Sequence, residues 1–370
     1  MASSATEPLL IIGGGLIGLA VAYELAKKGR SVEVLSRRRS EAAGFVAAGM
    51  LAPHAEGLQG SLLKLGQLSL DLIPTWVRSI EKDSGIDCGL KHCGIIVPFH
   101  SADDRDSHPT SSFGQVLTRK ELDLEVPGLT TDWKTALLFN QDGQIDNRRR
   151  LMRALEMACV SLGVHFREGV EVLDVITNNS TFQGVHILNA EGNVEMRPSE
   201  EGVLCSGAWS NQILKTIPIF PVKGEMLSLQ GPKEALRRII FGPGTYLVPR
   251  EDGLIIVGAT SDKKANFQIG LTPTGQNQLH EGIETLLPKA NHWPQMERWW
   301  GFRPCTPDEK PLLGTSSLKG LWLATGHYRN GVLLAAITAK LMGKCICKNQ
   351  LNYQETQILE EFNWQRFQLK

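Results

Sequence analysis

The chain has 370 residues, of which 42% are hydrophobic and 21% are charged. This length exceeds the need of one simple core, so two domains are expected. Lysine plus arginine number 39, as do aspartate plus glutamate, so the overall charge points to neither a nucleic-acid nor an anionic-membrane partner. No segment reaches the roughly 18 apolar residues that a membrane-spanning helix needs.

The seven cysteines form an odd set without the spacing of a zinc site or a secreted disulfide framework. Cys345 and Cys347 suit opposite faces of a helix or strand better than a shared metal. The nine histidines show no metal spacing, so no metal is expected. No lysine or arginine precedes the uncharged stretch 9–23, whereas the acidic residue Glu7 does. This pattern argues against a signal peptide. A reducing cytoplasm is the expected location.

The most informative motif is LLIIGGGLIG at residues 9–18, an apolar run that stops at three glycines. It contains Gly13-x-Gly15-x-x-Gly18 where a buried strand would join a helix, the layout of a dinucleotide-binding turn. Gly13 permits the tight turn, Gly15 lets the backbone approach a pyrophosphate, and Gly18 lets the helix pack closely on the strand. The helix N-terminus supplies the anion site.

A strand–helix–strand unit follows from this turn. Ile17, Val21 and Leu25 recur at four-residue spacing, Gly29 ends the helix, and residues 32–35 form the second strand. Many dinucleotide folds end this strand with an acidic residue that binds a ribose hydroxyl. Here Ser36 stands in that place, followed by arginines, which keeps NADP open as a rival cofactor. The runs 37–39 and 148–150 are otherwise interpreted as solvated loop or helix-start positions rather than binding patches.

The remaining elements follow in chain order. Small residues at 42–51 would let backbone approach a flat ligand, although a glycine-rich surface loop is the alternative. The polar segment 101–113 is expected to be an exposed loop. A second helix runs from Asp146 as N-cap to Gly163 as stop. Strands are expected at 164–166, 170–175, 185–188 and 203–205, a mostly antiparallel set between 218 and 301, and a strand at 321–324 before a helix at 332–342.

Because this last strand, glycine loop and helix repeat the opening pattern, the cofactor domain is expected to be discontinuous. The predicted fold is α/β, with a Rossmann-like cofactor domain and a substrate domain built on a mostly antiparallel sheet. The predicted ranges are 1–90, 144–217 and 303–370 for the cofactor domain, and 91–143 and 218–302 for the substrate domain.

Several separated motifs resemble one family. They are GGGLIG, AAGMLAPHAE at 47–56, SGAWS at 206–210, PVKGEML at 221–227, GFRPCTPDEKP at 301–311 and ATGHYRNG at 324–331. Together they are similar to flavin-dependent amine oxidases, the group of D-amino acid oxidase, sarcosine oxidase and glycine oxidase, and most of all to the glycine oxidases of the thiamine pathway. The resemblance covers essentially the whole chain. It implies FAD rather than NADP, and oxidative deamination of small amino acids.

Two departures from the family pattern bear on the cofactor. Ser36 replaces the acidic residue that many relatives place on the adenosine ribose, so that contact is in question. Sarcosine oxidases attach their flavin to a cysteine, and alignment on Thr306-x-Asp308 puts that position at Gly301. The resemblance therefore implies non-covalent FAD, although Cys305 lies nearby.

The expected catalytic residues are Arg303, Tyr246 and Arg329. A substrate carboxylate requires a planar guanidinium that can donate two parallel hydrogen bonds, which makes Arg303 and Arg329 candidates. The family places a tyrosine that touches this carboxylate at Tyr246. His327 is a candidate general base, but hydride transfer from a neutral amine needs no strong base, and packing beside the flavin is the preferred interpretation.

The resemblance and the glycine motifs also predict the residues that hold the cofactor. They are Gly13, Gly14, Gly15, Ile17, Gly18, Ser36, Arg37, Ala43, Ala47, Ala48, Gly49, Met50, Val172, Ser206, Gly207, Trp209, Gly301, Gly326, His327, Tyr328, Arg329, Asn330, Gly331, Val332 and Leu333. The helix that starts at Gly331 is expected to stabilise negative charge on the reduced flavin.

The leading hypothesis is an oxidase that converts glycine, sarcosine or D-alanine to the imine and O₂ to H₂O₂. The imine would yield glyoxylate and ammonia or serve thiazole synthesis. The alternatives are a flavin dehydrogenase that passes electrons to a quinone or partner protein, an NADP-dependent reductase, and a cofactor-bearing subunit or sensor. The expected partners are a small amino acid and O₂, without nucleic acid or membrane, and the resemblance implies a homotetramer.

Overall fold

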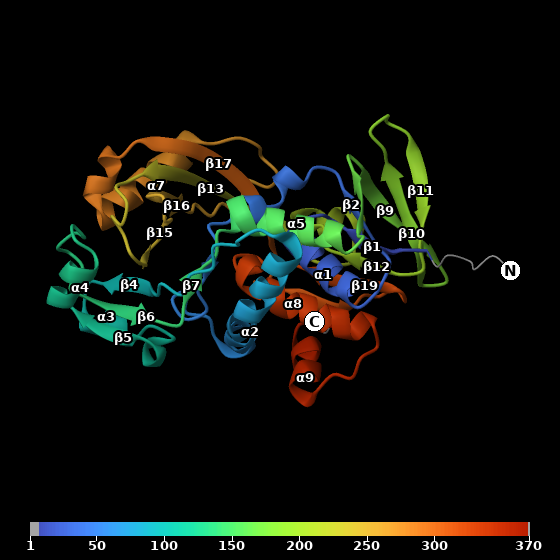
Figure 1. Cartoon of the computed structure of the whole chain (residues 1–370), viewed down its shortest axis with the longest axis horizontal. Helices are drawn as coiled ribbons and strands as arrows, with labels where there is room; N and C mark the ends of the chain where they lie inside the picture. The colour runs from blue at the N-terminus through green and yellow to red at the C-terminus, as the bar shows by residue number, and fades with distance from the viewer. Residues whose placement is uncertain (1–6, 369–370) are drawn as a thin grey trace.

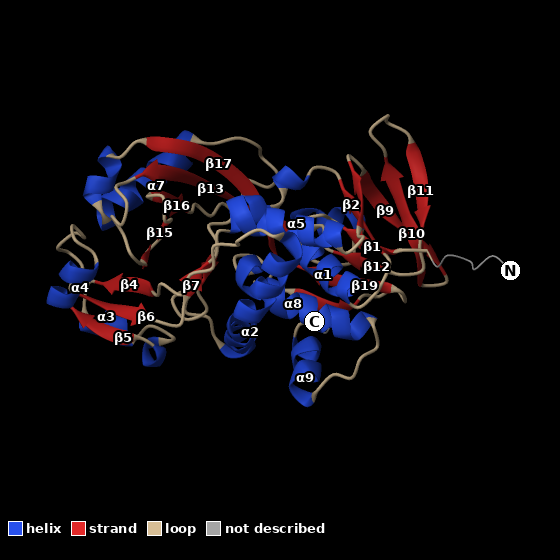
Figure 2. Ribbon diagram, in the orientation of Figure 1, coloured by secondary structure: helices blue, strands red, loops and turns tan. Residues whose placement is uncertain are grey.

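The structure is a computed structural model that describes residues 7–368. The predicted ranges 1–90 and 303–370 therefore include ends, residues 1–6 and 369–370, that lie outside the described residues. Two large sheets lie at opposite sides of the molecule, with helices between and around them (Figure 2).

The first sheet is mostly parallel and contains strands from both the N-terminal and the C-terminal parts of the described chain. Its order is β18 (Leu312–Thr315), β19 (Leu321–Thr325), β12 (Gly202–Leu204), β1 (Leu9–Ile12), β2 (Val32–Ser36) and β8 (His165–Glu168). Its pairs are parallel except for β18 with β19. The apolar strand β1 lies inside this sheet and is completely buried, as expected of a strand covered on both faces.

Side chains of β1 alternate between two cores. Leu9 and Ile11 pack with the helices, whereas Leu10 and Ile12 pack against a smaller antiparallel sheet. The helices on the first face are α1 (Leu16–Lys27), α2 (Gly60–Ser84), α5 (Met152–Ser161) and α8 (Gly331–Ile346) (Figure 1). The smaller sheet on the other face consists of β9 (Glu171–Asn178), β10 (Thr181–Leu188) and β11 (Val194–Pro198).

The second large sheet is antiparallel except where β14 pairs with β4. Its order is β17 (Gln295–Cys305), β13 (Phe220–Gln230), β16 (Leu254–Gly258), β15 (Thr245–Pro249), β14 (Ile239–Gly242), β4 (Ile95–Phe99), β6 (Thr135–Phe139) and β5 (Gln115–Thr118). Helices α4 (Arg119–Glu125) and α7 (Pro273–Leu286) contribute to a separate core on this sheet, seen at the left of Figure 1. The predicted fold class is thereby confirmed.

Short elements complete the chain. The ribbon of β3 (Met50–Leu51) and β7 (Gly143–Gln144) connects the regions of the two large sheets. Helix α3 (Ala102–Asp106) follows β4, α6 (Ser210–Ile213) follows β12, and α9 (Tyr353–Glu361) lies near the end of the described chain.

Several sequence predictions of local structure agree with the structure. Asp146 accepts a hydrogen bond from the N–H of Arg149 and caps a π-helical turn at Asn147–Leu151 that continues into α5. Gly29 and Gly163 follow their helices with φ of 76° and 77°, the left-handed conformation that a glycine stop supplies. The helix expected at 332–342 is longer and spans Gly331–Ile346.

Two expectations of local structure need correction. Helix α7 interrupts the region 218–301 that was expected to be strand-like. The segment 101–113 is not a simple exposed loop, because it contains α3 and Thr110 is completely buried. Helix α2 was not identified from sequence. The boundary predicted between residues 302 and 303 falls inside β17, which continues to Cys305, and the domain ranges stay a prediction.

Arg39 begins the short helix at Arg39–Glu41, a helix start as expected, but it is not solvated. Its side chain is only 18% exposed and forms ion pairs with Glu156 (2.7 Å) and Glu168 (2.6 Å). The run 148–150 lies in the turn at Asn147–Leu151 and makes ion pairs with Glu297, Asp252 and Asp87. Carboxylates that are distant in the sequence therefore help to hold Arg39 and the second run, which the local sequence does not reveal.

Candidate active site

One cavity of about 900 Å³ runs between the parallel sheet and the antiparallel sheet. It begins at the Gly13–Gly15 turn and reaches Arg303 and Tyr246 on the antiparallel sheet. This volume lies in the upper part of the range found for ligand pockets in proteins. A single elongated ligand can therefore contact the glycine turn and the second sheet at once.

The glycine turn leaves no room for side chains. Gly13 has a φ of 114°, and a Cβ there would lie 2.7 Å from the carbonyl oxygen of Cys205. A Cβ on Gly18 would lie 1.9 Å from the carbonyl oxygen of Gly13, so α1 packs directly on the turn. The N-terminus of α1 thus faces the cavity behind bare backbone, an arrangement that suits a pyrophosphate.

The arginines after Ser36 are already neutralised. Arg37 contacts Glu41 at 2.8 Å and Glu171 at 3.3 Å, and Arg38 contacts Glu41 at 3.0 Å. Arg37 also lies over the ring of Trp209. Because these guanidinium groups have carboxylate partners, they are poorly suited to a ribose 2′-phosphate, and the NADP hypothesis loses its main support.

The loop of small residues reaches the cavity with its backbone. Gly49 has a φ of 84°, and a Cβ there would lie 2.0 Å from the carbonyl oxygen of Ile145. Arg250 donates hydrogen bonds to the carbonyl oxygen of Ala48 and to Gln144. Burial lowers the pKa of Arg250 to about 10. Sequence reasoning did not identify Arg250, since it follows an ordinary strand without any motif around it.

The second glycine loop is fastened to β17 and ends in α8. The N–H of Tyr328 donates to the carbonyl oxygen of Pro304 at 2.8 Å. His327 is 2% exposed, and its Nε2 lies 3.0 Å from the hydroxyl of Thr338. Burial lowers the pKa of His327 to about 3, so the imidazole is neutral near pH 7. A neutral, buried ring agrees with the packing interpretation better than with a proton-accepting role.

Arg303 lies on β17 with its guanidinium in the cavity. It donates from Nη1 to the carbonyl oxygen of Thr260 at 3.0 Å. Gly224, on the neighbouring strand β13, provides its space, because a Cβ there would lie 2.4 Å from Nη1. Burial lowers the pKa of Arg303, although nearby Tyr246 acts in the opposite direction. A partly desolvated guanidinium with free donors is chemically suited to bind a carboxylate.

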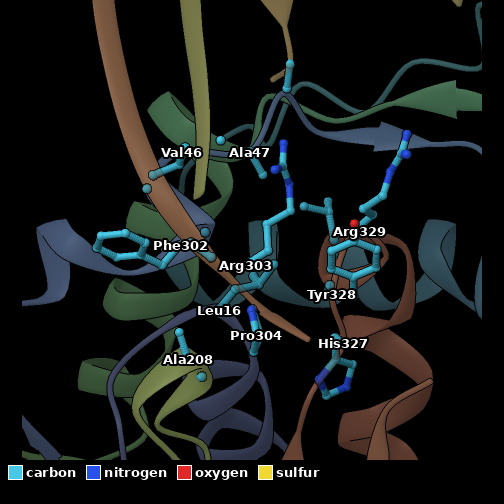
Figure 3. A pocket seen from close by; sticks show the side chains of 18 of the residues that line it. Leu16, Val46, Ala47, Ala208, Phe302, Arg303, Pro304, His327, Tyr328 and Arg329 are labelled. Carbon is cyan, nitrogen blue, oxygen red and sulfur yellow. The ribbon is translucent and has the colours of Figure 1, made fainter. Parts of the chain in front are cut away.

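Tyr246 lies on β15 opposite Gly258, where a Cβ would lie 2.5 Å from the tyrosine hydroxyl. Burial raises the pKa of this hydroxyl, and Arg303 and Arg329 partly offset the rise. The phenol therefore stays protonated and can donate a hydrogen bond. In Figure 3 the side chains of Arg303 and Arg329 extend to the same side, while the ring of His327 lies away from them among the C-terminal segments.

Glu56 is the functional candidate that sequence reasoning missed. It lines the cavity, its side chain is 10% exposed, and its Oε2 lies 3.3 Å from Nε of Arg329. Burial raises its pKa, while Arg329 and Arg303 act to lower it. The motif AAGMLAPHAE ends at this residue, so a signal was present, but nothing in the motif indicated that Arg329 was its partner.

The structure brings most of the predicted site residues to this one cavity. Four predicted residues do not line it, namely Gly18, Gly326, Asn330 and Leu333. Gly18 lies beneath the turn, Gly326 packs on Thr306, and the carbonyl of Leu333 accepts from Ser69. Further lining residues that were not predicted include Glu41, Phe99, His100, His108, Trp133, Phe241, Thr260, Gln278 and Phe302.

Two absences can be stated for residues 7–368. Within them no group of three or more His, Cys, Asp or Glu side chains is arranged to hold a metal ion. No helix in the same range combines the length and apolar character needed to span a bilayer.

Cys305 is buried and is not among the cavity-lining residues, and its Sγ contacts the carbonyl oxygen of Thr306. Nothing in that position conflicts with the expected non-covalent cofactor.

Known proteins resemble this chain over its whole length. The bifunctional protein ThiO/ThiG of Synechocystis sp. is 40% identical over 370 residues, covering 98% of this chain and 54% of that protein. The chain thus spans about half the length of these bifunctional relatives. The glycine oxidase of Geobacillus kaustophilus is 32% identical over 354 residues, covering 91% of this chain and 92% of that protein.

The fold comparison agrees. The crystal structure of glycine oxidase from Geobacillus kaustophilus has a TM-score of 0.87 and 29% identity, covering 97% of this chain and 98% of that chain. The family model for DAO, the FAD-dependent oxidoreductases, matches residues 9–344. The expected cofactor, FAD, is confirmed by this match, and the cavity with its glycine turn fits it. The chain belongs to the DAO family of FAD-dependent oxidoreductases.

Proposed function

We propose that this protein is an oxidase of small amines, with glycine as the leading substrate and sarcosine or D-alanine as close alternatives. Glycine would lose two electrons and two protons to become an imine, which water hydrolyses to glyoxylate and ammonia, while O₂ accepts the electrons and becomes H₂O₂. The observation that supports this most strongly is Arg303, a partly desolvated guanidinium in the same cavity as the glycine turn. Relatives named glycine oxidase support the choice of substrate.

In this proposal Arg303 and Tyr246 bind the substrate carboxylate. The guanidinium has one protein acceptor, Thr260, which leaves donors for a carboxylate, and the protonated phenol adds another donor. Holding the carboxylate fixes the α-carbon, so the main contribution of these residues is orientation. Arg329 lies at the same end, where it is paired with the carboxylate of Glu56.

Backbone and small residues would hold FAD along the rest of the cavity. The glycine turn and α1 suit the pyrophosphate, the Ala47–Gly49 loop suits a flat ring, and the α8 N-terminus directs its positive dipole end toward the cavity. When bound, FAD supplies the acceptor for the hydride equivalent that leaves the α-carbon. His327, being neutral and buried, would pack beside it.

The biological setting is also a proposal. Relatives named ThiO/ThiG suggest that the imine serves the thiazole part of thiamine. All seven cysteines are unpaired, in keeping with the expected cytoplasmic location. A homotetramer remains a prediction, and sedimentation equilibrium of the flavin-loaded protein would measure it directly.

The test is anaerobic mixing of the flavin-loaded enzyme with glycine, sarcosine and D-alanine while flavin absorption is followed. We expect rapid bleaching with at least one of the three. Readmission of air should restore the oxidised spectrum with stoichiometric H₂O₂. An enzyme whose flavin stays oxidised with all three substrates would contradict the proposal.

A dehydrogenase that passes electrons to a quinone is not favoured. It predicts bleaching by the substrate but slow reoxidation in air. An oxygen electrode separates the two cases, because only the oxidase consumes O₂ during turnover.

A further inference from the structure

The substrate end of the cavity contains an unequal set of charges. Two guanidinium groups, those of Arg303 and Arg329, meet one carboxylate, that of Glu56. The carboxylate is paired with Arg329, with Oε2 and Nε 3.3 Å apart. Arg303 has no carboxylate partner among the described residues and donates to the carbonyl oxygen of Thr260.

The other ionisable groups near this end leave Arg303 without a carboxylate partner. Asp142 acts to raise the pKa of Glu56, but its own carboxylate contacts the ring of His54 at 2.6 Å. Asp104 and His100 are exposed, and burial lowers the pKa of His108, which favours its neutral form. Glu309 affects Arg329 only weakly and is itself bonded to Lys263 at 2.8 Å, outside the cavity lining. One guanidinium therefore remains free for one carboxylate of a ligand.

The turn before Glu56 is firmly anchored. Asp142, which is fully buried, accepts hydrogen bonds from the N–H groups of His54 (3.2 Å) and Ala55 (2.8 Å). The carboxylate of Asp142 also contacts Nδ1 of His54 at 2.6 Å. The backbone of Glu56 is thus fixed independently of its own side chain, so a change at that side chain should leave the turn in place.

We propose that Glu56 is a specificity-determining residue that restricts the enzyme to amines with a single carboxylate, because it occupies Arg329. This inference rests on the proposed function, in which Arg303 binds the first carboxylate. A substrate with a second carboxylate on its nitrogen substituent would bring a second negative charge toward Arg329. In the native enzyme it meets the Glu56 carboxylate there, and like charges at such a distance repel.

The test is Glu56→Gln in the flavin-loaded enzyme, which keeps the size of the side chain and removes its charge. Glycine and iminodiacetate, the N-carboxymethyl derivative of glycine, would be compared by anaerobic flavin reduction. We expect the ratio of kcat/KM for iminodiacetate to that for glycine to rise at least tenfold. A ratio unchanged within twofold, with glycine still oxidised, overturns the inference.

Two controls separate charge from structure. Glu56→Asp keeps the charge and should keep the native ratio, and Glu309→Gln removes a nearby carboxylate outside the cavity and should also keep it. A rise of the ratio in Glu309→Gln as large as in Glu56→Gln would overturn the assignment to Glu56.

A measurement on the native enzyme covers the case in which Glu56→Gln does not fold. Acetate and malonate, which carry one and two carboxylates, can be titrated against the flavin spectrum at about pH 8, where both ligands are fully ionised. Because the Glu56 carboxylate is paired with Arg329 at 3.3 Å, the second carboxylate of malonate should add no affinity. Malonate that binds at least tenfold more tightly than acetate overturns the inference. Failure of glycine to reduce the native flavin would contradict the proposed function, which is a separate outcome.

Discussion

Arg303 combines partial burial with few protein partners. Its desolvation carries a cost that the carbonyl oxygen of Thr260 only partly offsets. An arginine in this condition gains most from an anionic ligand, since a carboxylate can accept two parallel hydrogen bonds from it. Gly224, which yields space beside it, would be unnecessary if the arginine only filled a core.

Substitution Arg303→Ala should therefore reduce kcat/KM for glycine by roughly 10²-fold or more, about 2.7 kcal/mol of transition-state stabilisation. The flavin content should not change, because the substrate end and the glycine turn lie at different ends of the cavity. Steady-state kinetics and the flavin-to-protein absorption ratio measure the two quantities. Arg298→Ala, an exposed arginine of the same strand, serves as the control and should retain native kinetics. Full activity in Arg303→Ala would contradict the assigned role.

A second prediction at this scale concerns Asp308 and Arg366. Burial acts to raise the pKa of Asp308, but hydrogen bonds from Arg366 at 2.8 and 3.1 Å outweigh it and lower the pKa overall. A lowered carboxyl pKa stabilises the fold above the ordinary pKa of aspartate, and this stabilisation is lost as the pH falls through the lowered value.

Asp308→Asn should accordingly lower Tm at pH 7, by the equivalent of about 1 kcal/mol for this partly exposed pair. The difference from the native protein should shrink in strong acid, as thermal denaturation at several pH values can show. Glu309→Gln breaks a pair whose side chains are 56% and 47% exposed, so it should have a smaller effect. An equal loss of Tm in both variants would argue against a larger contribution from the less exposed pair of Asp308 and Arg366.

At the scale of elements, strand β13 makes space at the substrate end because Gly224 carries no side chain. It pairs with β17 over most of its length, with Gly224 opposite Gly301, and the guanidinium of Arg303 lies over Gly224. A methyl group at this position must displace the guanidinium. The position is set by strand register, which a shift of one residue would change for every side chain.

Gly224→Ala should therefore raise KM for glycine by at least about tenfold, which corresponds to 1.4 kcal/mol, while flavin binding persists. Ser228→Ala on the same strand is the matched control, because its buried hydroxyl has no partner among the described residues and it does not line the cavity. Native kinetics in Gly224→Ala would show that Arg303 tolerates the displacement, contrary to this prediction.

At the glycine turn, the packing of α1 on β1 gives an element-scale prediction for the cofactor. A Cβ on Gly18 would clash with the carbonyl oxygen of Gly13, so Gly18→Ala must push the helix away from the turn. We expect a protein that is purified with much less flavin and has a higher Kd for FAD by fluorescence titration. Flavin content equal to the native protein would show that the turn adjusts without cost.

At the scale of the whole molecule, two sheets with separate cores share one cavity. Ion pairs such as Arg149 with Asp252 at 2.7 Å also join the region of α5 to the β15–β16 turn. A ligand that contacts both regions binds only when they are correctly arranged. Its binding free energy is then added to the stability of the folded state.

Removal of FAD should lower Tm, and titration with free FAD should restore it in a concentration-dependent manner. At free FAD one hundred times its Kd, linkage predicts about 2.7 kcal/mol of stabilisation. Differential scanning calorimetry of the apoprotein with increasing FAD measures this. An apoprotein with the same Tm as the flavin-loaded protein would contradict a cavity shared by both regions.

The sequence by itself determined the nucleotide-binding part and the fold class. Gly13 and Gly49 adopt backbone conformations that glycine favours, and β1 reads as a buried apolar run, so these features depend on local physics. The family motifs also predicted Arg303 and Tyr246 as candidate site residues from the sequence alone. The sequence pattern did not predict helices α2 and α7, because their positions depend on packing against other segments.

Only the tertiary structure decided which charges meet. Glu56 and Arg329 lie far apart along the chain, and Arg303 meets the carbonyl of a residue 43 positions away. Arg250 likewise reaches Ala48 across 202 positions. No local period or motif encodes such pairs, because burial and strand register bring them together only after folding. The sequence could thus predict Arg303 as a candidate site residue, but it could not predict that the Glu56 carboxylate pairs with Arg329.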